Sequence, residues 1–138
     1  MARIWQISEA AAIGIHAAAI LSVNRDRGVP IREIAETLRA SEAHCSKVLQ
    51  RLTKNGLVTS VRGPGGGYSL ARSPEEIRVW DLYEALEGTQ QATQCLFREN
   101  RGCRFHREHC LLEGVVEQVN ALITETFLST TLADLAER

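Results

Sequence analysis

A glycine-rich segment, Arg62-Gly63-Pro64-Gly65-Gly66-Gly67-Tyr68, constrains the fold of this chain more than any other stretch. Four of its seven residues are glycine, so the segment offers few side chains with which to pack a core. It lies between two short β-like runs, residues 57–61 and 68–70. Glycine tolerates positive φ and close backbone approach, which suits the tip of a tight hairpin. We therefore predict a β-hairpin with a cationic side chain, Arg62, at the base of its tip.

The residues directly before the hairpin predict two helices joined by a short turn at residues 39–40. Pro30 suits the first turn of the first helix, Ser41 is a candidate N-cap of the second, and Asn55-Gly56 can end it in the left-handed conformation. Helix, turn, helix and hairpin is the order of a winged helix-turn-helix, so we expect a mainly α fold with a small β-hairpin. Apolar residues recur at helical spacing, namely Ile31, Ile34, Ala35 and Leu38, then Cys45, Val48, Leu49 and Leu52.

The opposite face of the second helix is polar and basic, as a helix that reads a DNA groove requires. In a winged helix-turn-helix this helix enters the major groove, and the wing touches the backbone or the minor groove. A solvated helix face is the alternative explanation of the same pattern. We predict contacts with double-stranded DNA, at a pseudo-palindromic operator, from His44, Lys47, Gln50, Arg51, Lys54, Arg62, Gly65 and Gly66.

Charge is unevenly distributed along the chain, although the net charge is only −1. Residues 31–72 carry seven basic and three acidic residues, which gives +4. Residues 73–138 carry six basic and twelve acidic residues, which gives −6. The basic excess therefore falls on the predicted helix-turn-helix and wing, as expected where phosphates are bound. Ordinary surface charge is the alternative explanation.

The N-terminal apolar run predicts a buried helix from a Ser8 cap to about residue 22, with Glu9 in its first turn. The apolar run from 10 to 21 is too short to span a bilayer, and Glu9 and His16 interrupt an export core. Four cysteines without an export signal favour reduced thiols. We therefore expect a cytoplasmic protein without membrane association.

Two further helices are predicted after the wing. Residues 80–86 form a short helix that Gly88 ends, and residues 111–127 form a long amphipathic helix with a wide apolar stripe. That stripe exceeds what a small winged domain can cover, so a homodimer is expected. The predicted organisation is a DNA-binding domain at 1–88, a cysteine-bearing loop at 89–110, and a dimerisation helix with a C-terminal turn at 111–138. No catalytic constellation is visible, so we do not expect an enzyme.

Three of the four cysteines, Cys95, Cys103 and Cys110, lie in the polar segment after the short helix. Their spacing lacks the two-residue gap typical of a structural zinc site. Three thiolates give an incomplete ligand set, which zinc could complete with His106 or His109. An iron–sulfur cluster is the other metal that suits such thiolates, and three unrelated thiols is the alternative to both. Cys45 lies on an apolar stripe and is expected to be a core residue.

The wing string, together with Asn55-Gly56-Leu57-Val58, closely resembles the Rrf-type winged-helix regulators. These include the cluster-biogenesis regulator IscR, the nitric-oxide sensor NsrR and the iron regulator RirA. The resemblance extends from Ile7-Ser8 to the closing residues 131–135. It implies a cytoplasmic, homodimeric transcriptional repressor or activator that binds DNA and senses iron, redox or nitric-oxide status. Arg62 matches the arginine of the family's wing.

The resemblance also implies a 4Fe–4S or 2Fe–2S cluster on Cys95, Cys103 and Cys110, whose spacing is similar to that of RirA. Several members complete the cluster from the partner's first helix, and Glu9 and His16 are the candidates there. Glu113 replaces the histidine that follows the last cysteine in IscR, and Glu113, His106 and His109 are the local candidates for the weaker ligand. A regulator of the same fold without a cluster, or a zinc-stabilised interaction module, are the alternative functions.

Overall fold

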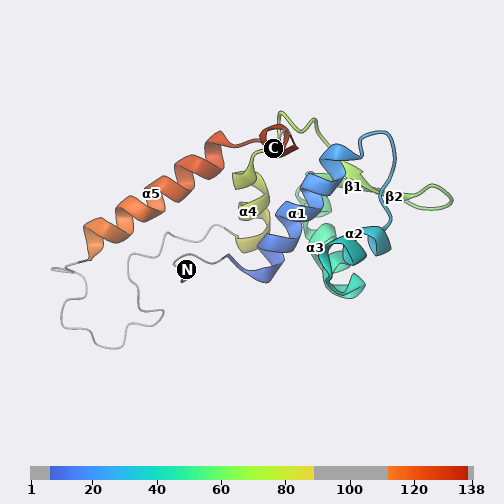
Figure 1. Cartoon of the computed structure of the whole chain (residues 1–138), viewed down its shortest axis with the longest axis horizontal. Coiled ribbons are helices and arrows are strands. Elements are labelled where there is room, and N and C mark those ends of the chain that lie inside the picture. Colours follow the sequence, from blue (N-terminus) through green and yellow to red (C-terminus); the bar gives the residue numbers. More distant parts are fainter. Residues whose placement is uncertain (1–6, 89–111, 137–138) are drawn as a thin grey trace.

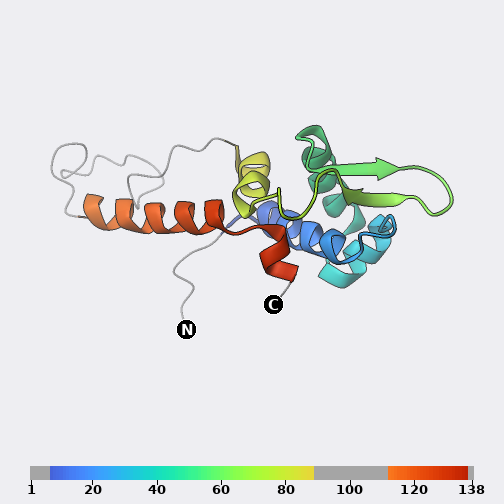
Figure 2. The same cartoon turned by 90° about the horizontal axis from the view of Figure 1, so that it is seen from above.

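The computed structural model describes residues 7–88 and 112–136, which form six helices and one antiparallel hairpin (Figures 1 and 2). The order of elements confirms the predicted winged helix-turn-helix with a long C-terminal helix. The elements are α1 (Glu9–Val23), α2 (Ile31–Leu38), α3 (Glu42–Lys54), β1 (Val58–Val61), β2 (Gly67–Leu70), α4 (Val79–Glu87), α5 (Glu113–Ser129) and α6 (Leu132–Ala136).

Helix α1 is the centre of the fold and contacts α2, α3, α4, α6 and β2. Its predicted N-cap is confirmed, because Ser8 Oγ accepts a hydrogen bond from the Ala11 amide at 3.0 Å. Small residues let neighbouring helices approach closely. The clearest case is Gly14, where an added Cβ would lie 2.2 Å from Leu86 Cδ1 of α4. A larger residue at this position would push α4 away from α1.

Helices α2 and α3 form the predicted helix-turn-helix. Arg39 connects them in the left-handed conformation with φ of 51°, and Ser41 Oγ caps α3 by accepting from the His44 amide at 3.2 Å. Pro30 is the N-cap of α2 and precedes the first turn in which it was expected. Gly56, with φ of 68°, follows α3 as predicted. The inward face of α3 is fully covered at Cys45, Val48, Leu49 and Leu52.

The wing pairs Val58 with Leu70 at its base and Val61 with Gly67 at its outer end. Its second strand also pairs on its other edge with Val29, which exchanges two hydrogen bonds with Tyr68 at 2.8 and 2.9 Å. The residue that leads into α2 therefore anchors the wing. This close approach requires glycine at position 67, since a Cβ there would lie 2.6 Å from the Val29 carbonyl.

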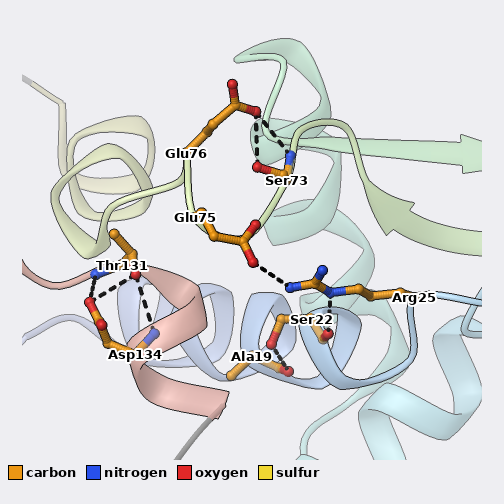
Figure 3. A network of polar contacts seen from close by, with 8 residues as sticks. All are labelled: Ala19, Ser22, Arg25, Ser73, Glu75, Glu76, Thr131 and Asp134. Atoms are coloured by element: carbon orange, nitrogen blue, oxygen red, sulfur yellow. Dashed lines mark hydrogen bonds and ion pairs between the residues drawn. The ribbon is translucent and has the colours of Figure 1, made fainter.

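The C-terminal turn α6 packs against α1 of the winged domain, whereas the predicted organisation groups it with the dimerisation helix. Leu132 is fully buried in the main core, and its amide donates to the Ile77 carbonyl at 2.9 Å. Figure 3 shows how Asp134 accepts hydrogen bonds from the backbone and hydroxyl of Thr131 at the start of this turn. Thr131 Oγ1 in turn accepts from the Asp134 amide at 3.2 Å and so caps this turn. Residues at both ends of the described chain share one core.

Helix α5 projects away from the winged domain in both views (Figures 1 and 2). Near its C-terminal end Phe127 packs edge-on against Tyr83 of α4, with ring centroids 5.5 Å apart. Val116 is buried and Ile123 is half-buried, whereas the other apolar residues of the stripe are exposed to solvent in this single chain. The exposed apolar residues of this segment are Leu112, Val115, Val119, Leu122 and Leu128.

Candidate nucleic-acid interface

The outward face of α3 presents the residues that were predicted to touch DNA. Lys47, Gln50 and Lys54 are exposed and His44 is half-buried. The Gln50 amide donates to Ser46 Oγ at 3.3 Å, which orients the side chain along the helix and leaves its oxygen free to accept. Amide and cationic side chains on one helix face can pair with base edges and phosphates.

Arg51 lies on the same helix, but its guanidinium points to α4. Nη2 donates to the Leu86 carbonyl and to the Ala85 carbonyl, the latter at 3.4 Å. These two carbonyls lie in the last turn of α4, where helices have unpaired acceptors and a partial negative charge. Sequence periodicity placed Arg51 with the DNA contacts, whereas the structure gives it an intramolecular partner.

The wing tip consists of residues 62–66, and Arg62 and its neighbours are exposed. A hydrogen bond of 2.9 Å from the Gly66 amide to the Gly63 carbonyl closes the tip. A Cβ at Gly66 would lie 2.3 Å from the Val61 carbonyl, so only glycine fits this turn. Gly65, with φ of 74°, has open space around it. The tip is therefore a narrow backbone loop that can approach a groove closely.

The cations of α3 and the wing differ from three arginines elsewhere in the structure, because those three are paired with carboxylates. Arg25 binds Glu75 at 3.0 Å (Figure 3), Arg27 binds Glu33, and Arg32 binds Glu36. Hydrogen bonding from Arg27 also lowers the pKa of the Glu33 carboxyl. By contrast, the exposed cations of α3 and the wing have no ion pair within residues 7–88 and 112–136. Exposed cations without an ion pair suit phosphate binding, because no protein carboxylate neutralises them.

Two exposed cations next to these elements were missing from the predicted contacts. Arg39 is in the turn between α2 and α3, and Arg72 follows the wing. Both had been counted in the basic excess of residues 31–72. That regional charge was the signal that could have identified them.

The predicted metal ligands Cys95, Cys103 and Cys110 lie outside the described residues, as do His106 and His109. Glu9 and His16 are both exposed on α1. His16 Nδ1 donates to the Ala12 carbonyl at 2.7 Å, since a carbonyl can only accept. In the neutral imidazole, Nε2 then keeps a free lone pair and is the nitrogen that could bind a metal.

Cys45 is fully buried in the core, as predicted. Burial raises the pKa of its thiol, which disfavours the thiolate that metals bind. The described part of the chain contains no group of three His, Cys, Asp or Glu residues placed to hold a metal ion. In the same residues, no helix combines the length and the apolar character that crossing a membrane requires.

Comparisons with known proteins identify the family. The profile of the Rrf2 family, described as "Iron-dependent Transcriptional regulator", matches residues 7–138. An HTH-type transcriptional regulator of Aquifex aeolicus is 35% identical over 119 residues, which cover 86% of this chain and 83% of that protein. The HTH-type transcriptional regulator IscR of Pectobacterium carotovorum is 38% identical over 107 residues, 78% of this chain. The match spans only 63% of the length of that IscR.

Two solved structures share the fold over nearly the whole chain. IscR of T. potens superposes with a TM-score of 0.78 at 32% identity, covering 97% of this chain and 88% of that one. CymR, the global cysteine regulator of B. subtilis, superposes with the same TM-score at 25% identity, covering 97% and 98%. The helix-turn-helix, the wing and the family match agree with one another: this chain belongs to the Rrf2 family of DNA-binding transcriptional regulators, which are not enzymes.

Proposed function

We propose that this protein is a cytoplasmic regulator whose affinity for operator DNA depends on an iron–sulfur cluster. The observation that carries the DNA-binding mode is the unpaired cationic surface formed by α3 and the wing. Helix α3 enters the major groove with Lys47, Gln50 and Lys54, and Arg62 reaches the backbone or the minor groove. Arg39 and Arg72 add phosphate contacts at the two ends of this surface.

The protein acts as a homodimer, and α5 forms the interface. Leu112, Val115, Val119 and Leu122 are spaced three or four residues apart and are all exposed in the single chain. Such a stripe on a projecting helix suits packing against a second copy of the same helix. A two-fold dimer presents two α3 helices, so the operator is a pseudo-palindrome whose half-site spacing follows from the dimer.

The cluster would be held by Cys95, Cys103 and Cys110, with a weaker ligand from α1 of the partner. Support comes from the family description, from the IscR relatives and from the donor chemistry of α1. Of the two exposed candidates, His16 fits better than Glu9, because its Nδ1 hydrogen bond leaves Nε2 available for iron. The bound cluster supplies redox-sensitive and displaceable iron ligation. The chain's part is to hold it with three thiolates and one weaker donor, which oxygen, nitric oxide or iron loss can displace.

Anaerobic purification of the full chain tests the cluster directly. We expect brown protein that contains iron and acid-labile sulfide. Replacing Cys95, Cys103 or Cys110 by serine should abolish the colour, whereas the matched Cys45→Ala variant should keep it, since Cys45 is buried in α3. Colourless wild-type protein, or a Cys45 variant that alone loses iron, contradicts the proposal.

The similarity to CymR favours a second candidate function, a regulator of the same fold that works without a cluster. In that case the thiols at 95, 103 and 110 respond directly to oxidants, or the protein responds to a partner. Protein that binds operator DNA while colourless and free of iron and zinc would support this alternative. Stoichiometric zinc without iron would instead indicate a structural metal site on the same cysteines.

A further inference from the structure

The C-terminal end of α4 joins three parts of the molecule. Leu86 packs against Gly14 of α1, where an added Cβ would lie 2.2 Å from Leu86 Cδ1. Glu87 accepts a hydrogen bond from Ser8 Oγ, the N-cap of α1. The carbonyl of Leu86 accepts from Arg51 of α3. Helix α4 ends at Glu87 with Gly88 as its C-cap. In the sequence, the segment that carries the three cysteines begins at residue 89.

Arg51 is the polar connection between this junction and the reading helix. The last carbonyls of a helix lack intrahelical donors and carry partial negative charge, so a guanidinium at this point stabilises the helix end by a charge-assisted hydrogen bond. Arg51 lies in the last turn of α3, one helical turn after Lys47 and one before residue 55. A change in the position of the α4 end therefore acts on α3 through a short and directional contact.

We propose that Arg51 is a positioning residue, which couples the C-terminal end of α4 to the reading helix instead of binding DNA phosphate. This inference rests on the proposed cluster-dependent function. When the segment that starts at residue 89 holds its ligand, the last turn of α4 keeps its carbonyls aligned with Arg51, and α3 keeps its reading orientation. When the cluster is lost, the Arg51 contact is lost with it and α3 leaves that orientation. The two arrangements are the two states that the cluster biases.

The packing around the contact supports a rigid link. Val48 of α3 also approaches Gly14, since a Cβ there would lie 3.3 Å from Val48 Cγ1. Leu86 and Val48 thus both pack against one glycine of α1, so α3 and α4 share this contact. Ser8 joins the same α4 end to the start of α1, the helix that carries Glu9 and His16. The last turn of α4 is therefore joined both to the start of α1 and to α3.

An Arg51→Gln variant tests the proposal against its control, Lys47→Gln, which removes a charge from the same helix without touching α4. For each full-length protein, operator affinity is measured in the cluster-loaded and the iron-free form at several salt concentrations. In wild type we expect the two forms to differ by about 5–150-fold, the usual range of allosteric coupling. Arg51→Gln should bring this ratio close to one and leave the salt dependence unchanged. Lys47→Gln should preserve the ratio and reduce the salt slope by about 0.9.

Two further results distinguish a failure of the Arg51 coupling role from a failure of the cluster-dependent function. If Arg51→Gln keeps the wild-type ratio, the coupling role is wrong. If it also weakens both forms equally with a smaller salt slope, Arg51 is a phosphate contact. If wild type itself contains no iron, or binds equally in both forms, the cluster-dependent function falls and the coupling falls with it. An Arg51→Lys variant keeps a cationic donor but lacks the forked geometry of the guanidinium. It should retain part of the difference in operator affinity between the two forms. If Arg51→Gln shows no cooperative thermal transition and is therefore not folded, Arg51→Lys is used in its place.

Discussion

At the scale of single residues, glycine decides the shape of the wing because backbone from three segments meets there. Gly66 and Gly67 are the two positions where a side chain would collide with backbone, at Val61 and at Val29 respectively. Backbone atoms cannot rotate away as the end of a long side chain can. These glycines therefore hold the wing against the residue that leads into α2, and they keep its tip narrow.

A Gly67→Ala substitution should destabilise the protein more than Gly56→Ala. Gly56 has φ of 68° and open space, so alanine there costs only the left-handed backbone penalty of about 1–2 kcal/mol. At Gly67 the φ of 150° is combined with a contact of 2.6 Å to the Val29 carbonyl. Overpacking adds about 1–3 kcal/mol, so the loss should exceed that of the control by this amount. Urea unfolding measures both values, and equal losses would contradict the tight contact at Val29.

At the scale of elements, the polar contacts divide the cations into two groups. Arg25 joins the end of α1 to the connector before α4 through Glu75 (Figure 3), which serves the fold. The pKa of the Glu75 carboxyl is lowered, first by its backbone hydrogen bond and then by Arg25. Arg62 and the α3 lysines have no such partner in the described chain. The surface they form is therefore available to DNA.

An Arg62→Ala variant should weaken operator binding and reduce its dependence on salt. Loss of one phosphate contact lowers the slope of log affinity against log salt by about 0.9. If Arg62 instead reads a base edge, the loss should be about 1–3 kcal/mol on the selected operator only. Titration of labelled operator and of random DNA at several salt concentrations distinguishes the two cases. Arg25→Ala is the matched control, because its cation is paired with Glu75. Unchanged binding by Arg62→Ala would refute the role of the wing.

Local chemistry explains which elements the sequence could predict. Ser8, Ser41, Thr131 and the glycine at 88 act on amides or carbonyls within a few residues, so helix boundaries were predicted within about two residues. The pairing of Val29 with Tyr68 spans distant segments and left no local pattern. The same holds for the return of Leu132 to the core, which depends on packing that only the tertiary structure defines.

For the candidate site, too, the sequence predicted which helix face is exposed but not which side chains meet distant parts of the chain. Helical periodicity correctly put Cys45 in the core and Lys47, Gln50 and Lys54 on the outer face. It could not show that Arg51, on the edge of that face, meets the end of α4. The cysteines at 95, 103 and 110 were identified by spacing and resemblance, and their ligation remains a prediction.

At the scale of the whole molecule, α5 projects from the domain and exposes an apolar stripe that a second copy of the chain would cover. A Leu122→Asp substitution should dissociate the dimer, since Leu122 is 66% exposed in the single chain and lies in the middle of the stripe. A carboxylate buried at such a seam has no cationic partner there. Sedimentation should show monomer, with a helical spectrum close to that of wild type. The control is Glu125→Gln, because Glu125 is an exposed polar residue of the same helix. A Leu122→Asp protein that stays dimeric would exclude this face as the interface.

Operator affinity of the wild-type protein, with and without its cluster, tests the account most directly. The operator is first selected from random DNA with anaerobically purified protein. Its affinity is then measured for brown, loaded protein and for the same preparation after iron and sulfide are removed, with Cys103→Ser as the control that cannot load. The account predicts that the two wild-type forms differ by about 5–150-fold and that the control shows one affinity under both treatments. Equal affinity of the two wild-type forms would contradict it.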